Sequence, residues 1–380
     1  MGSRRAARAA GAFARAVLAG GAADPSGVDA DALTLVARHH RVGPSLDHLL
    51  AGAPDPAQRA LRAATRRAAL VQGARQLTVQ LDLRVVADAL DGLPWAVLKG
   101  PAVAATLHGG APREFHDLDV LVHPAAFGDA LRALEARGAR AMDPDWAGVR
   151  AARAGEIAVA LPHGTFLDLH WHLVNRPGRR ARFRVDVPGL LGRTRPAGLL
   201  GTPAPVLDAD DQLHHLALHA CLSGAWRLLW SYDLRLGAAA VRDWDVLVER
   251  CARAGTGLAV AMALGRARDV LGAPVPGAVL RALAGRSPWA VLGATATAVR
   301  PPHALTEARR NGAVLYTSAA DGTAASAREL VRALRARVAP PRAETSVSAS
   351  SALLAGAETL VSAREGYLAD VREAVQAPRR

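Results

Sequence analysis

The sequence is almost devoid of lysine, and it holds few cysteines and no long apolar run. Of its 47 basic residues 46 are arginine, and the single lysine is Lys99. The two cysteines, Cys221 and Cys251, fall in segments with helical spacing, which predicts free thiols rather than a disulfide framework. Because no apolar run approaches the roughly 18–20 residues that cross a bilayer, we expect a cytoplasmic protein without a membrane segment.

Aromatic residues are also scarce, which bears on the partner of this basic chain. They make up 4% of the 380 residues, while the net charge is +13. A polyanion would suit such a charge, but the arginines are scattered, with no interleaved aromatic residues to stack on bases. The composition therefore disfavours nucleic acid and favours a phosphate-bearing substrate on an otherwise solvated basic surface.

What the sequence has is enough apolar residues, 51%, for a globular chain of two or three domains. Apolar spacing and Pro/Gly breaks divide it into helical and mixed stretches. We expect an N-terminal helical region over 1–91, an α/β core over 92–175, a connector with short strands over 176–205, a helical accessory domain over 206–300, and a tail of unclear role over 301–380 with helices near 324–338 and 350–376.

Two carboxylates two residues apart begin a predicted strand of the core. Side chains alternate along a strand, so Asp117 and Asp119 share one face while Leu118, Val120 and Val122 share the other. Adjacent carboxylates repel each other unless a cation lies between them, and oxygen ligands of this type suit Mg²⁺ or Mn²⁺. The alternative is a pair of solvated or capping acidic residues at the start of a strand.

A third carboxylate lies in a later predicted strand, where Phe166, Asp168 and His170 share a face. An aspartate in the middle of a strand is disfavoured and costly if it is buried without a partner. A metal ion shared with Asp117 and Asp119 would compensate it, in the layout that metal-assisted phosphoryl transfer uses. Asp168 would also serve as general base for an acceptor hydroxyl. The alternative is a salt bridge from Asp168 to an arginine.

The lone lysine lies at a predicted strand-to-helix turn, Lys99-Gly100-Pro101. Glycine permits close approach of the backbone, and the compact ammonium of lysine differs from the planar fork of arginine. We therefore expect Lys99 and Gly100 to bind phosphate, with Arg113 as a bidentate phosphate ligand. The alternative for Lys99 is chance, since one remaining lysine must lie somewhere.

Taken together and in this order, these motifs resemble the DNA-polymerase-beta-like nucleotidyltransferase superfamily. The closer likeness is to a bacterial family of uncharacterised nucleotidyltransferases, over roughly 28–275. It rests on the segments Val97–Gly100, Arg113–Val122, Asp168–Trp171, Leu213–His219 and Arg227–Leu234, with further likeness at Leu35–Leu49 and Asp243–Trp244.

The resemblance implies an α+β fold in which a small mixed sheet is backed by helices. It also implies that Asp117 and Asp119 are Mg²⁺ ligands and that Asp168 is a ligand or base. The implied reaction moves a nucleoside monophosphate from a nucleoside triphosphate to an acceptor and releases pyrophosphate. His170, His219 and Asp233 match positions of the family and become candidates for the substrate side, although partly buried helix histidines are the alternative for His219.

The chain departs from the superfamily at its phosphate loop. The usual Gly followed by Gly or Ser is replaced by Lys99-Gly100 and then a proline, and the distance from Gly100 to Asp117 is long. Triphosphate binding must therefore differ in detail, and an inactive or repurposed site is an alternative.

The sequence thus predicts a magnesium-dependent nucleotidyltransferase whose acceptor is a small molecule, a peptide or a protein. Two other readings stay open. One is a non-catalytic module, antitoxin-like, that keeps the fold for binding. The other is a tailoring enzyme that uses another phosphorylated donor, such as an activated sugar.

Overall fold

The computed structural model describes residues 2–142, 145–299, 313–338 and 357–374, which form two compact units. The helical unit comprises Met1–Arg75, Val103–Phe115 and Ala209–Arg335, and the sheet unit comprises Gln76–Ala102, His116–Asp208 and Ala336–Arg380. The chain therefore passes between the units several times, and each unit is built from segments that are distant in sequence.

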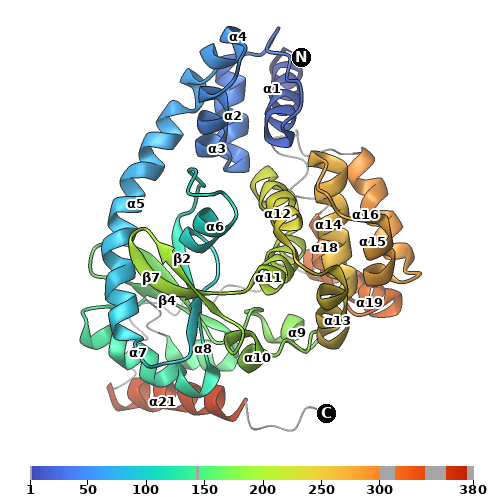
Figure 1. Ribbon diagram of the computed structural model, residues 1–380. Coiled ribbons are helices and arrows are strands. Elements are labelled where there is room, and N and C mark those ends of the chain that lie inside the picture. Colours follow the sequence, from blue (N-terminus) through green and yellow to red (C-terminus); the bar gives the residue numbers. More distant parts are fainter. Residues whose placement is uncertain (1, 143–144, 300–312, 339–356, 375–380) are drawn as a thin grey trace. The chain divides into compact units, whose positions relative to one another are not determined.

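The sheet unit holds a seven-stranded mixed sheet in the order β3-β4-β5-β2-β1-β7-β6 (Figure 1). β2 pairs with β5, and β1 with β7, in parallel; all other neighbouring pairs are antiparallel. The α+β fold with a mixed sheet that the sequence predicted is thereby confirmed. The strands are β1 (Trp95–Val97), β2 (Asp117–Val122), β3 (Arg140–Ala141), β4 (Glu156–Ala160), β5 (Phe166–His170), β6 (Arg195–Leu199) and β7 (Thr202–Val206).

The central strands are built from apolar residues that are buried on both faces of the sheet. All of β1 is buried, and Leu118, Val120, Leu121 and Val122 of β2 are fully buried. Continuous apolar runs of this kind are typical of strands covered on both sides. The aspartates at the start of β2 are thus exceptions in an apolar strand.

The segment 176–205, which we expected to be a connector with short strands, contains β6 and nearly all of β7, and both strands belong to the sheet. Leu200 and Gly201 both have positive φ, 49° and 79°, and join β6 to β7 in a two-residue hairpin turn. Positive φ at both turn positions matches the right-handed twist of the strands. Val206 of β7 pairs with Val97 of β1, so the hairpin extends the core sheet.

Helices of the sheet unit are α7 (Phe127–Ala136), α8 (Trp146–Ala151), α9 (Pro177–Arg180), α10 (Val187–Leu191), the 3₁₀ turn η1 (Pro124–Ala126) and the C-terminal part of α5 (Ala63–Ala89). The buried Asp82 of α5 accepts hydrogen bonds from the backbone N–H groups of His163 (3.0 Å) and Thr165 (2.9 Å). These bonds tie the β4–β5 turn to α5, and they hold the start of β5 in place.

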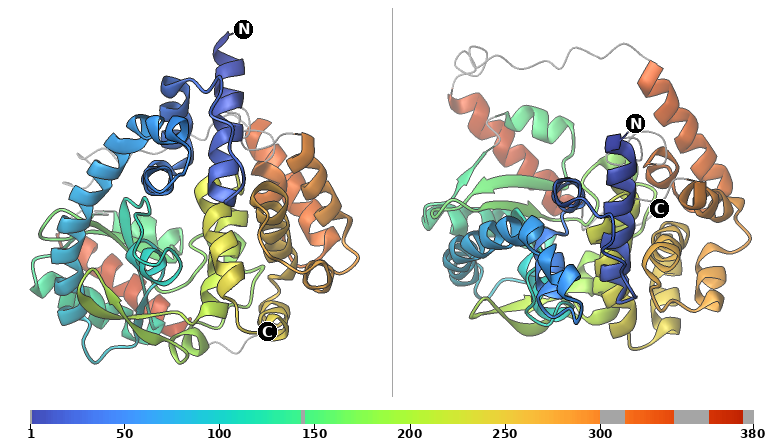
Figure 2. Two further views of the ribbon diagram at one scale, coloured as in Figure 1. Left: turned by 45° about the horizontal axis from the view of Figure 1, so that its top comes forward. Right: turned by 90° about the horizontal axis from the view of Figure 1, so that it is seen from above.

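The tail contributes helix α21 (Ala357–Glu373), which lies against α8 and α7 (Figures 1 and 2). Its buried Tyr367 donates a hydrogen bond to the carbonyl of Ala154 at 2.9 Å, and Asp370 forms an ion pair with Arg150 at 2.8 Å. The helix expected near 350–376 is therefore present over 357–373, while 350–356 and 375–376 lie outside the described residues. Its contacts give this part of the tail a structural role in the sheet unit.

The helical unit is organised around α14 (Gly257–Leu271), most of which is buried. Its neighbours include α11 (Ala209–Leu222), α12 (Leu228–Ala240) and α15 (Gly277–Ala284), so α14 is covered on several sides (Figure 1). The remaining helices are α1 (Gly2–Ala19), α2 (Ala30–His40), α3 (Gly43–Ala51), α4 (Pro56–Ala60), α13 (Trp244–Ala254), α16 (Pro288–Val299), α18 (Ala313–Thr317) and α19 (Thr323–Val338), and α6 (Pro101–Thr106) begins in the sheet unit and ends in this one.

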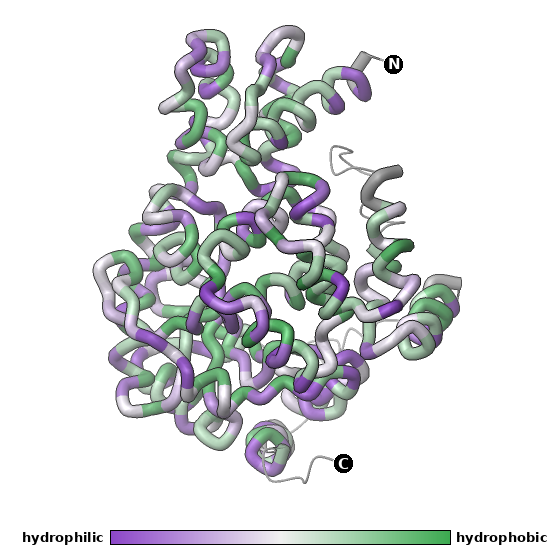
Figure 3. The backbone as a smooth tube through the Cα atoms, turned by 45° about the vertical axis from the view of Figure 1, so that its right-hand side comes forward, coloured by the Kyte–Doolittle hydropathy of each residue, from purple (hydrophilic) through white to green (hydrophobic). Residues whose placement is uncertain are grey.

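Hydropathy changes over short distances along the chain, with apolar and polar stretches alternating within most helices (Figure 3). Within the described residues, no helix combines the length and the apolar character that crossing a membrane requires.

Both thiols are buried in the helical unit, which predicts that they are unreactive in the folded protein. Burial raises the pKa of Cys251 to about 12, and Cys221 donates a hydrogen bond to the carbonyl of Tyr316 at 3.3 Å. The thiolate is the reactive species. We expect a chromogenic disulfide reagent to react with neither cysteine at mildly alkaline pH, and with both in guanidinium. A Ser26→Cys variant, with an exposed thiol, serves as control, and rapid reaction of the unmodified chain would contradict the structure.

Candidate functional site

The parallel pairing of β2 with β5 brings two of the predicted carboxylates side by side. Asp119 is the register partner of Asp168, and Asp117 is the partner of Phe166. Paired residues of neighbouring strands point to the same side of a sheet, so Asp117, Asp119 and Asp168 share one face. Asp119 is 2% exposed, whereas Asp117 and Asp168 are partly exposed. The buried carboxylate of Asp119 therefore lies next to two partly exposed carboxylates.

Lys99 reaches these carboxylates from the end of β1. The backbone N–H of Leu98 donates to the carbonyl of Asp119 at 2.9 Å, which places the next residue beside that aspartate. The ammonium Nζ of Lys99 lies 2.7 Å from Oδ1 of Asp119. Gly100 follows with a φ of 58°, in the left-handed region that glycine adopts at little cost. Gly100 forms the turn between Lys99 and the start of α6 at Pro101.

His170 and Glu156 complete the site from the other side. Nε2 of His170 lies 3.3 Å from Oδ1 of Asp119, and its Nδ1 forms an ion pair with Oε2 of Glu156 at 2.9 Å. Oε1 of Glu156 in turn accepts a hydrogen bond from Nδ2 of Asn175 at 2.6 Å. Asn175, Glu156, His170 and Asp119 therefore form one chain of polar contacts.

We did not predict Glu156 from the sequence. It is the register partner of His170 in the antiparallel pair β4–β5. The sequence did contain a signal for this contact. If the predicted strands are paired outward from the turn at 162–164, Glu156 lies opposite His170.

The charges of this cluster shift one another's pKa values. Burial opposes ionisation of Asp119, but Lys99 and His170 outweigh it and hold its pKa well below its usual range. Burial would lower the pKa of His170, yet its contacts with Asp119 and Glu156 raise that pKa to about 9. Burial and the negative charge of Asp119 raise the pKa of Asp168 to about 6. The protein thus compensates the negative charge of Asp168 less well than that of Asp119.

The donor set fits a divalent cation. Four carboxylates, Asp117, Asp119, Asp168 and Glu156, face two positive groups, Lys99 and protonated His170, so negative charge is in excess. Asp119, Asp168 and His170 each offer a ligand atom, and these atoms lie within 4.8 Å of one another. Carboxylate oxygens are the preferred ligands of Mg²⁺ and suit Mn²⁺ as well, whereas His170 could add a nitrogen ligand only after losing a proton. Asp117 lies on the same face but outside that group of three.

Two further candidates, Arg113 and Asp233, pair with each other in the helical unit. Nε and Nη2 of Arg113 donate to the two carboxylate oxygens of Asp233 at 2.9 and 2.7 Å, and Nε2 of His108 lies 2.9 Å from Oδ1. Asp233 is fully buried, and although burial opposes its ionisation, Arg113 and His108 lower its pKa. The phosphate-binding role expected for Arg113 and the substrate-side role expected for Asp233 stay predictions, while their contact with each other is a structural ion pair.

His219, the last candidate, lies near the end of α11 among aromatic rings. Its ring centre is 5.8 Å from that of Trp230 and 6.2 Å from that of His215. Arg227 stacks on Trp226 at 4.6 Å. Among the described residues, the group of three side chains able to hold a metal ion does not include His219. The substrate-side role of His219 therefore stays a prediction.

Removal of the Asp233 carboxylate should destabilise the protein. Asp233→Ala would leave the buried Arg113 without its carboxylate partner, which costs roughly 3–5 kcal/mol when one member of a buried pair is removed. The free energy of unfolding, measured by urea denaturation, should fall by that amount. The exposed Asp245→Ala is the matched control, with a change within about 1 kcal/mol. Equal effects of the two substitutions would show that the buried pair has no special weight.

Comparison with known proteins adds one finding. No curated protein and no solved structure matches the chain. Residues 26–272, well over half of the sequence, match the family described as "Uncharacterised nucleotidyltransferase". The matched range contains Lys99 and every carboxylate of the site in the sheet unit, and the resemblance that the sequence motifs indicated is confirmed. The chain therefore belongs to the uncharacterised nucleotidyltransferase family and is a transferase of nucleotidyl groups.

Proposed function

We propose that the chain moves a nucleoside monophosphate from a nucleoside triphosphate to an acceptor in a reaction that requires a divalent cation. The observation that carries the proposal is the register of β2 and β5, which sets Asp119 beside Asp168 with Asp117 on the same face. Carboxylates from neighbouring strands are the layout used for metal-assisted transfer to or from phosphates. Family membership supports the nucleotidyl group as the group transferred.

Asp117, Asp119 and Asp168 would hold the cation, Mg²⁺ or Mn²⁺, while protonated His170 keeps its contacts with Asp119 and Glu156. When bound, such a cation neutralises phosphate oxygens and balances the excess of carboxylates. The chain's own positive groups keep Asp119 ionised for this purpose. Because Glu156 holds Nδ1 of His170, the other ring nitrogen stays directed at Asp119.

Lys99 would bind the triphosphate together with the backbone at Gly100. The ammonium carries three donors, and only one is needed for the contact with Asp119. The Lys99 side chain is 17% exposed, compared with 3% for Asp119, so it remains reachable by a ligand. Gly100 has no side chain, so a phosphate could approach the backbone at this turn.

Asp168 would act as the general base. It is partly exposed, so the hydroxyl of an acceptor can reach its carboxylate. In the proposed step the acceptor oxygen forms a bond to the α-phosphorus, and its proton passes to the Asp168 carboxylate. The bond from the α-phosphorus to the bridging oxygen breaks, and pyrophosphate leaves with that electron pair.

Membership of a nucleotidyltransferase family favours this reading over a non-catalytic module and over an activated-sugar donor. The residues of the site are assigned to the cation, the triphosphate and the acceptor's proton, and none of them selects the rest of the acceptor. The acceptor is therefore proposed only as a small molecule, a peptide or a protein. The cytoplasmic location stays a prediction from the sequence.

Calorimetric titration of each nucleoside triphosphate, with Mg²⁺ and with EDTA, tests the site directly. We expect saturable binding that depends on Mg²⁺ and that the Asp117→Asn/Asp119→Asn double variant loses, because the two ligand charges are removed. Asp88→Asn/Asp91→Asn, which changes exposed carboxylates elsewhere, is the charge-matched control. A folded protein that binds no triphosphate, or a double variant that binds like the original chain, would refute the proposal.

The scarcity of lysine allows a sharper test of Lys99. Isotope-labelled lysine gives one side-chain NMR signal, since the chain has one lysine. We expect this signal to move when Mg²⁺ and the triphosphate are added together. Lys99→Arg should weaken triphosphate binding by roughly tenfold, the loss of about one charge-assisted hydrogen bond. An unmoved lysine signal in the presence of bound triphosphate would remove Lys99 from the phosphate site.

A further inference from the structure

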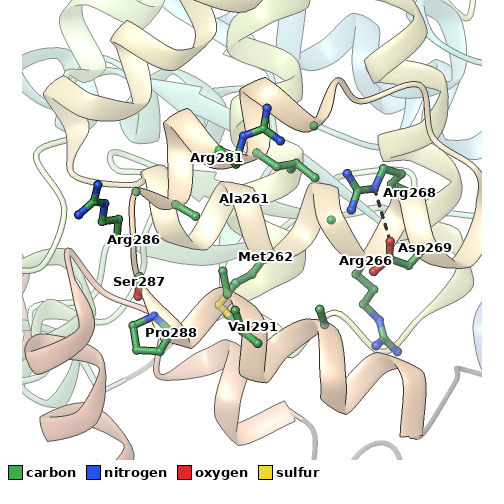
Figure 4. Close-up of a pocket in the computed structure, with 17 residues that line it drawn as sticks. Ala261, Met262, Arg266, Arg268, Asp269, Arg281, Arg286, Ser287, Pro288 and Val291 are labelled. Atoms are coloured by element: carbon green, nitrogen blue, oxygen red, sulfur yellow. Dashed lines mark hydrogen bonds and ion pairs between the residues drawn. The ribbon is translucent and has the colours of Figure 1, made fainter.

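The helical unit contains a pocket of about 570 Å³ to which no role has been assigned (Figure 4). It lies among α14, α15 and the start of α16, and every residue that lines it belongs to the helical unit. Pockets that bind small organic ligands commonly measure about 300–1,000 Å³. The pocket is therefore large enough for a ligand of that class.

The pocket combines an apolar wall with several arginines. Met262, Leu280 and Val291 supply apolar surface, and Arg268, Arg281 and Arg286 are exposed around it (Figure 4). A fourth arginine, the buried Arg266, also lines the pocket, and its guanidinium stacks near the ring of Tyr316 at 5.6 Å.

The lining has an excess of positive charge. Its one acidic residue, Asp269, forms an ion pair with Arg268 at 3.4 Å. Apart from Arg266, which is buried against Tyr316, three exposed arginines and one carboxylate line the pocket, so it favours an anion. Arginine forks bind the oxygens of carboxylate and phosphate groups in a bidentate manner.

The apolar wall of the pocket favours a ligand that has an apolar part as well as a negative charge. Val291 is 66% exposed although it is a large apolar residue, and Met262 behind it is buried. An inorganic anion would cover neither the exposed valine nor the apolar wall. A ligand with a hydrocarbon body would remove this surface from water.

The pocket also extends past the part of the chain that defines the family. The family match ends at residue 272, while α15 and α16 begin at Gly277 and Pro288. Two of the three helices that form the pocket thus lie beyond the matched range, so the pocket is not part of the matched region alone.

We propose that this pocket binds an amphipathic organic anion, a molecule with a hydrocarbon body and a phosphate or carboxylate head. The body would lie on Met262, Leu280 and Val291, and the head would be held by Arg281 with Arg268 or Arg286. The proposal does not depend on the nucleotidyl transfer reaction, since all of its residues are distinct from the carboxylate site of the sheet unit.

Calorimetric titration with four ten-carbon probes, below their micelle concentrations, tests the proposal. The probes are decyl phosphate, decanoate, decanol and decyltrimethylammonium. We expect one saturable site for at least one of the two anions, with decanol bound roughly tenfold or more weakly and the cation not bound. Tighter binding of decyl phosphate would identify a phosphate head, and tighter binding of decanoate a carboxylate head. Equal binding of decanol and the anions, or no saturable site, would overturn the proposal.

Three variants locate the binding. Arg281→Ser removes a charge of the pocket, and Val291→Asp adds a negative charge to its exposed apolar wall. Both should weaken binding of the anionic probe by roughly tenfold. Arg253→Ser removes another exposed arginine, from α13, that does not line the pocket, and it should leave the affinity unchanged. If all three variants bind alike, the probe binds elsewhere and the assignment to this pocket is wrong.

Two further titrations separate this proposal from the one for the sheet unit. The pocket variants should bind Mg²⁺ and nucleoside triphosphate as the original chain does. The Asp117→Asn/Asp119→Asn variant should still bind the anionic probe. Failure of triphosphate binding alone would leave the pocket assignment standing, and failure of probe binding alone would leave the transferase proposal standing.

Discussion

The parallel pairing of β2 with β5 is the constraint on which the candidate active site depends. It sets Asp119 opposite Asp168 in the register. A shift of one residue would turn Asp168 to the other face of the sheet, because side chains alternate along a strand. The hydrophobic residues Leu118, Val120, Leu167 and Leu169 oppose such a shift, since they would leave the core. Burial of one face of these strands therefore fixes the position of the carboxylates on the other.

The buried carboxylate of Asp119 is tolerated because positive groups surround it. Lys99 and His170 both lie within ion-pair distance of the same oxygen, and Glu156 holds the histidine from behind. Burial of an isolated charge would cost many kcal/mol, whereas a paired charge avoids most of this cost. The same arrangement leaves Asp168 with a raised pKa, so the network both stabilises the site and keeps one carboxyl basic.

Arginines of the helical unit have two kinds of surroundings: one is buried in an ion pair, and others are exposed around the pocket. Arg113 is buried and satisfied by Asp233, so it contributes to stability. Arg268, Arg281 and Arg286 are exposed around an apolar pocket, where they face one acidic residue. Because this chain uses arginine for almost every positive charge, residue type alone does not separate these roles; the local partners do.

The sequence by itself determined the local features of the site. Strand alternation placed Asp117 and Asp119 together, the predicted mixed α+β fold is confirmed, and the single lysine next to a glycine marked the turn before α6.

Tertiary structure decided what depends on distant residues: that Glu156 contacts His170, that Arg113 pairs with Asp233, that the β6–β7 hairpin extends the sheet, and that 103–115 belongs to the helical unit. Local patterns follow from the geometry of neighbouring residues, which the sequence contains. Partners such as Arg113 and Asp233, which are 120 positions apart, follow from how segments pack, and packing depends on the whole chain.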